Sequence, residues 1–401
     1  MKNKISVIAL LITVVIDIMG IGLVFPVLPE LFSPSGNHFQ LSSYYLYQGL
    51  CITMMIVPMG WTLCGLFIGY FADRYGRKVM ILMSLIVSVF SYLLCIYAIN
   101  IHSLSLFLAA RMLIGIAGGC YCLVQTVMSD IATTEELPTY VSWVNCASAI
   151  GFVIGALITS LSSYKGIAND VTLPFYIGAL LSLFGAVMIH VFFHESFQPN
   201  SDNTHNVIQA IIELFKLRTT RNLLISFFLI EIAWGIYLQA SPIILSNNYH
   251  YSTNLIAIFY LGYGLCAATA ILLLQPLFEK YFDYQTSIPW LSWIVKIAIF
   301  MTFFLASHIM NAVGMIVATF AEFLLFTGVL VMISTNSGNI SRGQTMGLVS
   351  TVIGASFLFS DLLIYLLESV DSIYSLLIVA LLFPGFYLLK PQSSEAVATS
   401  T

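Results

Sequence analysis

Long apolar stretches separated by short polar segments make up most of the sequence. A helix needs about 20 apolar residues to cross roughly 30 Å of hydrocarbon, and a window of this length finds twelve stretches that qualify. Strands of a membrane barrel would alternate apolar and polar residues, so we predict an all-α membrane protein with twelve transmembrane helices. The predicted spans are residues 6–28, 44–72, 79–99, 104–127, 139–161, 174–193, 222–246, 254–278, 287–307, 310–333, 346–367 and 372–389.

Lysine and arginine are distributed unevenly between the two sides of the predicted bundle. With the N-terminus inside, the cytoplasmic segments hold eleven of the 14 Lys and Arg residues, the outside loops hold Lys165, and the spans hold Arg111 and Lys296. Positively charged loops stay in the cytoplasm, so both termini are expected there. The first stretch is not expected to be a cleaved signal peptide, since it is too long and carries Asp17 at its centre.

One long polar segment, 195–221, divides the chain into two halves of similar length. We therefore predict an N-terminal six-helix bundle (1–194), a cytoplasmic linker (195–221) with a short amphipathic helix, a C-terminal six-helix bundle (222–390) and a disordered cytoplasmic tail (391–401). Two pseudo-symmetric bundles are typical of transporters that place their site at the midplane, between the repeats.

Composition narrows the functional classes further. Hydrophobic residues make up 59% and charged residues 8% of the 401 residues, the mean hydropathy is +0.96, and the net charge is -4. A soluble domain would carry about 25% charged residues, and a nucleic-acid-binding protein would show a basic surface. The seven cysteines lie in predicted spans, where they act as small apolar residues. Zinc-protease, serine-hydrolase and phosphate-loop motifs are absent from the sequence, so we predict no enzyme.

A charged loop follows the second predicted span. It fits the pattern G-x-x-x-D-R-x-G-R-[KR] at every fixed position, through Gly69, Asp73, Arg74, Gly76, Arg77 and Lys78. Gly76 permits a tight turn, and Gly69 lets a neighbouring helix approach closely. The pattern resembles the signature loop of the major facilitator superfamily. The resemblance implies that Asp73 lies against the N-terminus of the eleventh helix, where the helix dipole favours an anion, and that the loop is a cytoplasmic gate.

The first span carries a carboxylate and several residues that modify a helix. Asp17 lies near the predicted bilayer centre, where a charge is costly and is functional by default. Gly20 and Gly22 thin the helix, and Pro26 removes a backbone hydrogen bond and bends it. The run D-x-x-G-x-G-L-x-x-P-V-L-P resembles the first helix of tetracycline/H+ antiporters and of the wider drug:H+ antiporter branch. Alternatively, Asp17 only pairs with a neighbour in a helix softened for packing.

Other parts of the N-terminal half extend this resemblance and also depart from it. The fourth span carries Arg111 in a run similar to the R-x-x-x-G helix of that branch. The fifth span keeps two glycines of the antiporter motif, Gly151 and Gly155, which are expected to bend the helix, but it lacks the proline and the last two glycines. The third span has Ser91 where the tetracycline pumps have an aspartate. This difference argues against tetracycline as the substrate.

Four spans carry an ionisable residue near the middle, since Asp17, Arg111, Glu231 and Glu322 lie in spans one, four, seven and ten. The resemblance implies that these spans line the transport cavity and that Asp17 is the counter-ion of Arg111. A carboxylate buried without a partner favours its protonated form, so Glu231 and Glu322 are expected to carry protons. Glu322 could instead form a structural bridge with Lys296 in the ninth span.

Two aromatic residues and one further acid complete the candidate cavity. Trp234 and Tyr237 follow Glu231 at helical spacing and are expected to share its face. A carboxylate beside aromatic rings suits an amphipathic organic cation. Asp361 in the eleventh span and Lys296 are secondary candidates.

Together these features predict a secondary active transporter of a bacterial inner membrane. It would export small amphipathic molecules, either drugs or metabolites, in exchange for protons by alternating access. The altered motif of the fifth span leaves a second interpretation open, a proton-coupled importer of a nutrient or a siderophore carrier on the same fold. The expected partners are a small-molecule substrate, protons and the bilayer. We expect a monomer without catalytic residues, metal, cofactor or nucleic acid, and the sequence does not identify the substrate.

Overall fold

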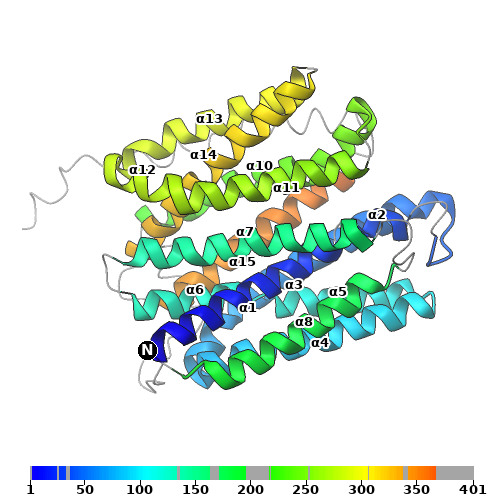
Figure 1. Cartoon of the computed structure of the whole chain (residues 1–401), viewed down its shortest axis with the longest axis horizontal. Coiled ribbons are helices and arrows are strands. Elements are labelled where there is room, and N and C mark those ends of the chain that lie inside the picture. Colours follow the sequence, from blue (N-terminus) through cyan, green and yellow to red (C-terminus); the bar gives the residue numbers. More distant parts are fainter. Residues whose placement is uncertain are drawn as a thin grey trace, which may run out of the picture.

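The computed structural model describes residues 2–24, 27–32, 37–132, 136–162, 171–195, 216, 218–251, 253–305, 307–336 and 342–366. This part of the chain is helical and connected by short turns (Figure 1). The helices are α1 (Lys2–Val24), α2 (Leu28–Leu31), α3 (Ser43–Tyr75), α4 (Arg77–Asn100), α5 (Leu104–Ala117), α6 (Cys120–Ile131), α7 (Leu137–Ser162), α8 (Leu173–Phe192), α10 (Arg218–Tyr249), α11 (Thr253–Thr269), the π-helix η1 (Ala270–Leu274), α12 (Gln275–Tyr281), α13 (Tyr284–Phe304), α14 (His308–Thr335) and α15 (Arg342–Leu366).

Eleven of the twelve predicted spans correspond to these helices. Within the described residues, ten helical segments are long and apolar enough to cross a membrane, and α7 adds the shorter apolar segment Thr139–Gly155. The all-α fold class is therefore confirmed. The predicted twelfth span (372–389) and the tail lie outside the described residues, as does the predicted linker apart from 195, 216 and 218–221. The domain boundaries consequently stay a prediction.

The helices form two groups that meet along a central layer. In Figure 1, α10 to α14 lie on one side, α1, α3, α4, α5 and α8 lie on the other, and α7 and α15 lie between them. Helix α7 packs against both α1 and α11, and α15 packs against both α3 and α10. One apolar core is formed mainly by residues of the group α10 to α15, and two others are formed by residues of the group α1 to α8. Contacts between the two groups are thus made mainly by the pairs α7–α11 and α3–α15.

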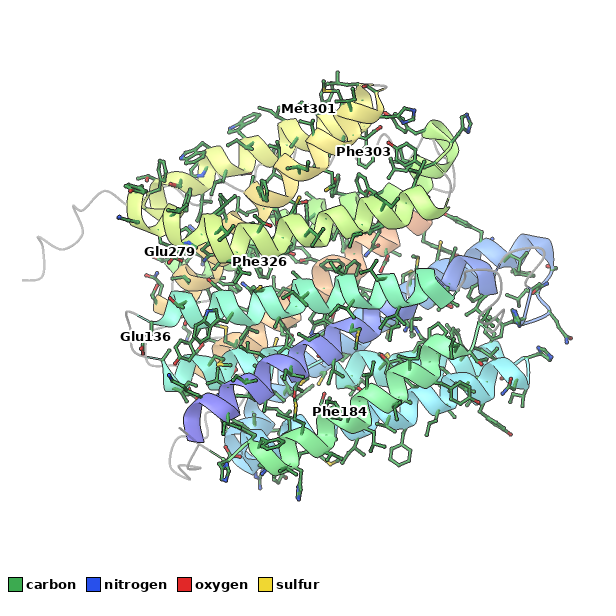
Figure 2. The ribbon with its side chains drawn as sticks, in the orientation of Figure 1. Glu136, Phe184, Glu279, Met301, Phe303 and Phe326 are labelled. Atoms are coloured by element: carbon green, nitrogen blue, oxygen red, sulfur yellow. The ribbon has the colours of Figure 1, made fainter. Side chains whose placement is uncertain are left out.

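Side chains on the outside of the bundle are largely apolar, as a bilayer requires. Phe184 on α8 projects outward in Figure 2 and is 56% exposed, and Leu180 and Ile309 are more exposed still. Charged residues gather at the ends instead: Glu136, just before α7, and Glu279 in α12 lie at the same end of the molecule (Figure 2). This is also the end that carries the N-terminus (Figure 1).

Two predicted spans are less regular than the sequence pattern indicated. The fourth span is not one continuous helix, because α5 ends at Ala117 and α6 begins at Cys120. Gly118 and Gly119 separate them, and two consecutive glycines are poor helix formers. The Ser84 hydroxyl donates a hydrogen bond to the carbonyl of Ala117. The eighth span contains the π-helical turn Ala270–Leu274, a form often found at functional sites.

The glycines predicted to bend the first and fifth spans lie at helix contacts. A Cβ atom on Gly151 would overlap the carbonyl oxygen of Val15 on α1, and one on Gly155 would overlap the carbonyl of Met19. Gly22 belongs to the same contact, with its backbone against Gly155. Both pairs therefore bring α1 and α7 together, and α7 stays helical through them.

Of the other two helix-modifying residues predicted in the first span, the structure describes Gly20 but not Pro26. A Cβ on Gly20 would overlap the Tyr92 hydroxyl of α4. Helix α1 ends at Val24, and Pro26 lies outside the described residues. The bend predicted at Pro26 therefore stays a prediction.

Candidate functional site

A cavity lies between the two helix groups. It is lined by α1, α3, α6 and α7 from one group and by α10, α11, α14 and α15 from the other. All four spans that the family resemblance places at a transport cavity contribute to it: the first (α1), the fourth (α6), the seventh (α10) and the tenth (α14). The location between the two halves is the one expected for a transporter built from repeats.

Glu231 on α10 and Glu322 on α14 both face this central cavity. Their side chains are 1% and 2% exposed. The Oε1 atom of each is buried and has no hydrogen-bond partner in the described part of the chain. The two carboxyl groups are close enough to interact electrostatically, and Lys and Arg are absent from the described lining of the cavity. The site therefore holds two acids whose simultaneous ionisation would be costly.

Aromatic side chains surround these acids. Trp234 and Tyr263 line the cavity, and each contributes a ring beside the carboxyl groups. Tyr237, predicted to share the face of Glu231, is not part of the lining but stacks against Trp234, with ring centroids 5.0 Å apart. It packs on its other side against Phe303. Tyr237 thus fixes the Trp234 ring rather than facing the cavity.

Asp17 does not share the cavity of the two glutamates. It lines a separate pocket inside the first helix group, between α1, α3, α4, α5 and α8. Its Oδ2 atom is buried and has no hydrogen-bond partner within the described residues, and its carboxyl group interacts with the backbone N–H of Tyr121. That N–H belongs to the first turn of α6, where backbone donors are unpaired and the helix dipole favours an anion. The break at Gly118 and Gly119 creates this helix N-terminus.

The predicted ion pair between Asp17 and Arg111 is not formed. In the described residues no salt bridge joins the two side chains, and the Arg111 Nε atom is buried without a hydrogen-bond partner. The side chain of Tyr92 interacts electrostatically with both. Of the four mid-span residues, Glu231 and Glu322 thus line the central cavity together, whereas Asp17 lines a separate pocket.

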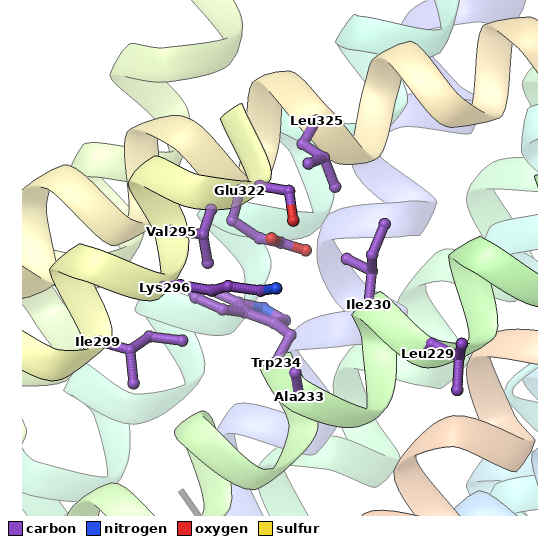
Figure 3. A pocket seen from close by; sticks show the side chains of 10 residues that line it. Leu229, Ile230, Ala233, Trp234, Val295, Lys296, Ile299, Glu322 and Leu325 are labelled. Carbon is purple, nitrogen blue, oxygen red and sulfur yellow. The ribbon is translucent and has the colours of Figure 1, made fainter. Parts of the chain in front are cut away.

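A third pocket lies between α10, α13 and α14. Figure 3 shows Lys296 and Glu322 at this pocket, with Lys296 extending beside the Trp234 ring. Glu322 and Trp234 also line the central cavity, so these two side chains separate the two spaces. Lys296 and Glu322 thus line the same pocket, on the side away from the central cavity, and the bridge between them stays a prediction.

Asp361, the other secondary candidate, lies apart from these pockets. It is 5% exposed on α15 and accepts a hydrogen bond from the side chain of Gln239 on α10. It does not belong to the described lining of the central cavity or of the two smaller pockets. The structure therefore assigns Asp361 to the contact between α10 and α15.

Polar side chains that the sequence did not single out link the two helix groups. Asn145 on α7 accepts hydrogen bonds from Tyr121 (2.7 Å) and Gln125 (3.1 Å), and it donates one to Thr327 on α14 (3.2 Å). Asn145 joins this network because α6, α7 and α14 pack together, and no local sequence motif predicts that packing.

The loop between α3 and α4 holds a charge cluster at one end of the bundle. Arg77 is buried, with its Nη1 atom 2.7 Å from Asp130 and its Nη2 atom 3.3 Å from Asp73. Asp130 comes from the end of α6 and was not predicted to belong to this cluster, although it lies in a charged run of the sequence. The cluster therefore ties the second and third spans to the fourth.

The remaining residues of the loop have distinct roles. Gly76 adopts φ +91°, in the region that favours glycine, and so permits the turn between α3 and α4. Glu195, after α8, accepts a hydrogen bond from the backbone N–H of Lys78 at the start of α4 (2.9 Å), and the Lys78 ammonium donates to the His190 carbonyl (2.9 Å). Arg74 is exposed and donates to the Tyr70 hydroxyl (3.4 Å).

The predicted gate also involves the start of the eleventh span. Gly69 lies against Gly347 of α15, where a Cβ on Gly347 would be 3.6 Å from the Gly69 Cα atom. Helix α15 begins at Arg342, and residues 337–341, which precede it, lie outside the described residues. A contact between Asp73 and that helix start stays a prediction. Among the described residues, no three His, Cys, Asp or Glu side chains gather as a metal site.

Comparisons with known proteins agree with this architecture. The tetracycline resistance protein of class B from Escherichia coli is 26% identical over 273 residues, which cover 66% of this chain and 63% of that protein. The quinolone resistance protein NorA of Staphylococcus aureus (strain MRSA252) is 25% identical over 342 residues, covering 83% of this chain and 82% of NorA. The chain thus matches less than two thirds of the length of the class B protein.

Among solved structures, the human organic anion transporter MFSD10 (TETRAN) superposes with a TM-score of 0.74 at 16% sequence identity, covering 96% of this chain and 99% of that one. At this identity the likeness shows a shared fold. The sequence profile described as Major Facilitator Superfamily matches residues 10–360. With the two helix groups, the cavity between them and the charged loop after the second span, this match shows that the chain belongs to the major facilitator superfamily.

Proposed function

We propose that this protein exports small amphipathic cations in exchange for protons, by alternating access of the central cavity. The observation that carries the proposal is the pair Glu231 and Glu322: two buried carboxyl groups, one from each of two helices, facing one cavity lined with aromatic rings. Carboxylates beside aromatic faces favour organic cations over anions.

The proposed exchange follows from competition at these two acids. When the cavity is empty, desolvation and mutual repulsion favour at least one protonated carboxyl group. A bound cation stabilises the ionised form, so its arrival releases a proton. Return of a proton from the other side then displaces the cation. One site thus binds either the cation or the proton, which is the condition for coupled antiport.

The relatives support the choice of efflux over uptake. Their names describe resistance to tetracycline and quinolones, and the Multidrug resistance protein 2 of Bacillus subtilis is 29% identical over 188 residues. We accordingly place the protein in a bacterial inner membrane, as a monomer, with the Asp73–Arg77–Asp130 cluster and both termini in the cytoplasm. The drug or metabolite that it carries is a separate question, because Ser91 replaces the aspartate of the tetracycline pumps.

The test is proton flux in everted membrane vesicles with an acid interior. A permanently charged aromatic cation (ethidium), a zwitterion and an organic anion are added in turn to vesicles containing the wild type, Glu231→Gln or Glu322→Gln. Ethidium is expected to release protons from wild-type vesicles, and either variant is expected to lose at least about 90% of that flux, a ΔΔG‡ of about 1.4 kcal/mol or more. Glu136→Gln is the matched control, since this glutamate is exposed at the end of the bundle.

Two results would count against the proposal. If only the organic anion released protons, the charge class of the substrate would be wrong. If no compound released protons while whole cells accumulated a labelled nutrient or iron chelate in a Glu322-dependent manner, the direction of transport would be reversed.

A further inference from the structure

Lys296 occupies a costly position that the proposed exchange does not explain. It lies ten residues into a helical span that begins at Thr286 and ends at Phe304, about 15 Å from the start at 1.5 Å per residue. A charged side chain near the middle of the bilayer costs several kcal/mol unless it is paired or reaches water, and such residues are functional by default. The Lys296 ammonium lies 5.1 Å from the centre of the Trp293 ring, and Lys296 lines a pocket that Glu322 also lines.

Glu322 lies between two spaces that differ in the charged side chains lining them. On the side of the central cavity it meets Glu231 from α10 and Tyr263 from α11. Tyr121 reaches the same cavity from α6, whereas α7 and α15 contribute uncharged side chains there. On the opposite side, the pocket between α10, α13 and α14 presents one cation, Lys296 (Figure 3). The pocket's other described lining residues are apolar apart from Trp234 and Ser292.

We propose that Lys296 is the counter-cation of Glu322. Its ammonium reaches this carboxylate from the side pocket and so gives Glu322 and Glu231 different roles. The ammonium stabilises the ionised form of Glu322 without entering the central cavity. Glu322 then remains available to a substrate cation near neutral pH, and Glu231, which has no such partner in the cavity, retains the exchangeable proton. This inference rests on the proposed function and adds a positioning residue to it.

A purely structural bridge would use the same two residues but would have a different consequence. Such a bridge would hold α13 to α14 and leave the pH dependence of transport unchanged once the protein is folded. A counter-cation, in contrast, determines the pH above which Glu322 is ionised and can bind a substrate cation. The two roles are therefore separated by a pH profile and not by the loss of activity alone.

The experiment measures ethidium-driven proton flux between pH 5.5 and 9 for the wild type, Lys296→Met and Lys296→Arg. Ethidium keeps its charge throughout this range, so the profile reports on the protein. Without the ammonium, Glu322 holds its proton to a higher pH, and the midpoint of the Lys296→Met profile is expected to shift by about one pH unit to the alkaline side, a tenfold change in proton affinity. Lys296→Arg retains the charge and is expected to keep the wild-type midpoint.

Each outcome decides the question. An unshifted Lys296→Met profile overturns the inference, and so does an equal shift in Lys296→Arg, since shape and not charge would then be responsible. If Lys296→Met does not accumulate in the membrane, Lys296→Gln serves as the neutral variant with the same expected shift. A wild type that is silent with ethidium overturns the proposed function and this inference with it. A working wild type with an unshifted neutral variant overturns the inference alone.

Discussion

Trp61 on α3 donates its indole N–H to the hydroxyl of Ser350 on α15, over 2.8 Å. This hydrogen bond crosses between the two helix groups, and Trp61 lines both the central cavity and the Asp17 pocket. Asn145 and Thr327 make a second polar contact between the groups. Both bonds must break if the halves separate at these positions during transport, so they contribute to the equilibrium between conformations.

The first prediction concerns these two hydrogen bonds. A hydrogen bond contributes about 1 kcal/mol net, so Thr327→Val and Ser350→Ala should each raise the population of the separated arrangement by about fivefold. Cys122 reports this change because it is 2% exposed and hydrogen-bonds to Ser350. The measurement is the rate of maleimide labelling of Cys122, with the other six cysteines replaced by alanine.

The double variant provides the control for this prediction. Because the two bonds are separate contacts, the effects of Thr327→Val and Ser350→Ala on the labelling rate should multiply. Thr327→Val is the more informative single change, since it does not alter the immediate partner of Cys122. A labelling rate equal to that of the parent protein in Thr327→Val would show that the Asn145–Thr327 bond does not hold the halves together.

The second prediction concerns the buried guanidinium at the end of the bundle. Asp130→Asn removes the shorter of the ion pairs that Arg77 makes with Asp130 and Asp73; the Arg77 side chain is 2% exposed. Because Asp130 itself is 27% exposed, we expect a loss of about 2 kcal/mol, between the values for surface and for fully buried pairs. The melting temperature of the purified protein in detergent should fall accordingly. Arg74→Gln, at an exposed position of the same loop, should leave it unchanged, and an equal fall in both variants would contradict the assignment.

The sequence predicted the elements of the fold well for a physical reason. Bilayer thickness imposes a length on every span, so apolar windows located the eleven spans that lie in the described part of the chain. The turn at Gly76 was predicted because it depends on local backbone conformation, and the structure shows the positive φ that it requires. Gly118 and Gly119 are also visible in the sequence, but the apolar residues on both sides of them predict one continuous span, whereas the structure has α5 and α6.

The arrangement of the charges could not be predicted in the same way. Asp17 and Arg111 each lie near the middle of a span, yet depth in the membrane does not specify the direction in which a side chain points around its helix. Tyr92 of α4 interacts with both residues, and this placement depends on how α4 packs. Asp130 joins Arg77 for a similar reason, because α6 ends beside the loop. Packing between distant segments, not local pattern, determines these contacts.

The third prediction tests the contact between α1 and α7. Gly151→Ala or Gly155→Ala would place a Cβ atom onto the backbone of α1, and overpacking of this kind costs about 1–3 kcal/mol. The melting temperature in detergent should fall in both variants. Gly185→Ala on α8 is the matched control, because its Cβ would meet Ile16 and Leu85 at ordinary distances of 3.4 to 3.7 Å. A stable Gly155→Ala protein would contradict a close contact of the two helices.

The last prediction separates Asp361 from the acids of the cavity. Asp361 is as deeply buried as a functional carboxylate, but its hydrogen-bond partner is Gln239 and it does not line the described central cavity. Asp361→Asn keeps the volume and the hydrogen-bonding capacity of the side chain, so ethidium-driven proton flux should stay within about twofold of wild type, a ΔΔG‡ below about 0.5 kcal/mol. Glu322→Gln, an equally conservative change, should lose it. If Asp361→Asn were as inactive as Glu322→Gln, the proton path would have to extend from the cavity along the contact between α10 and α15.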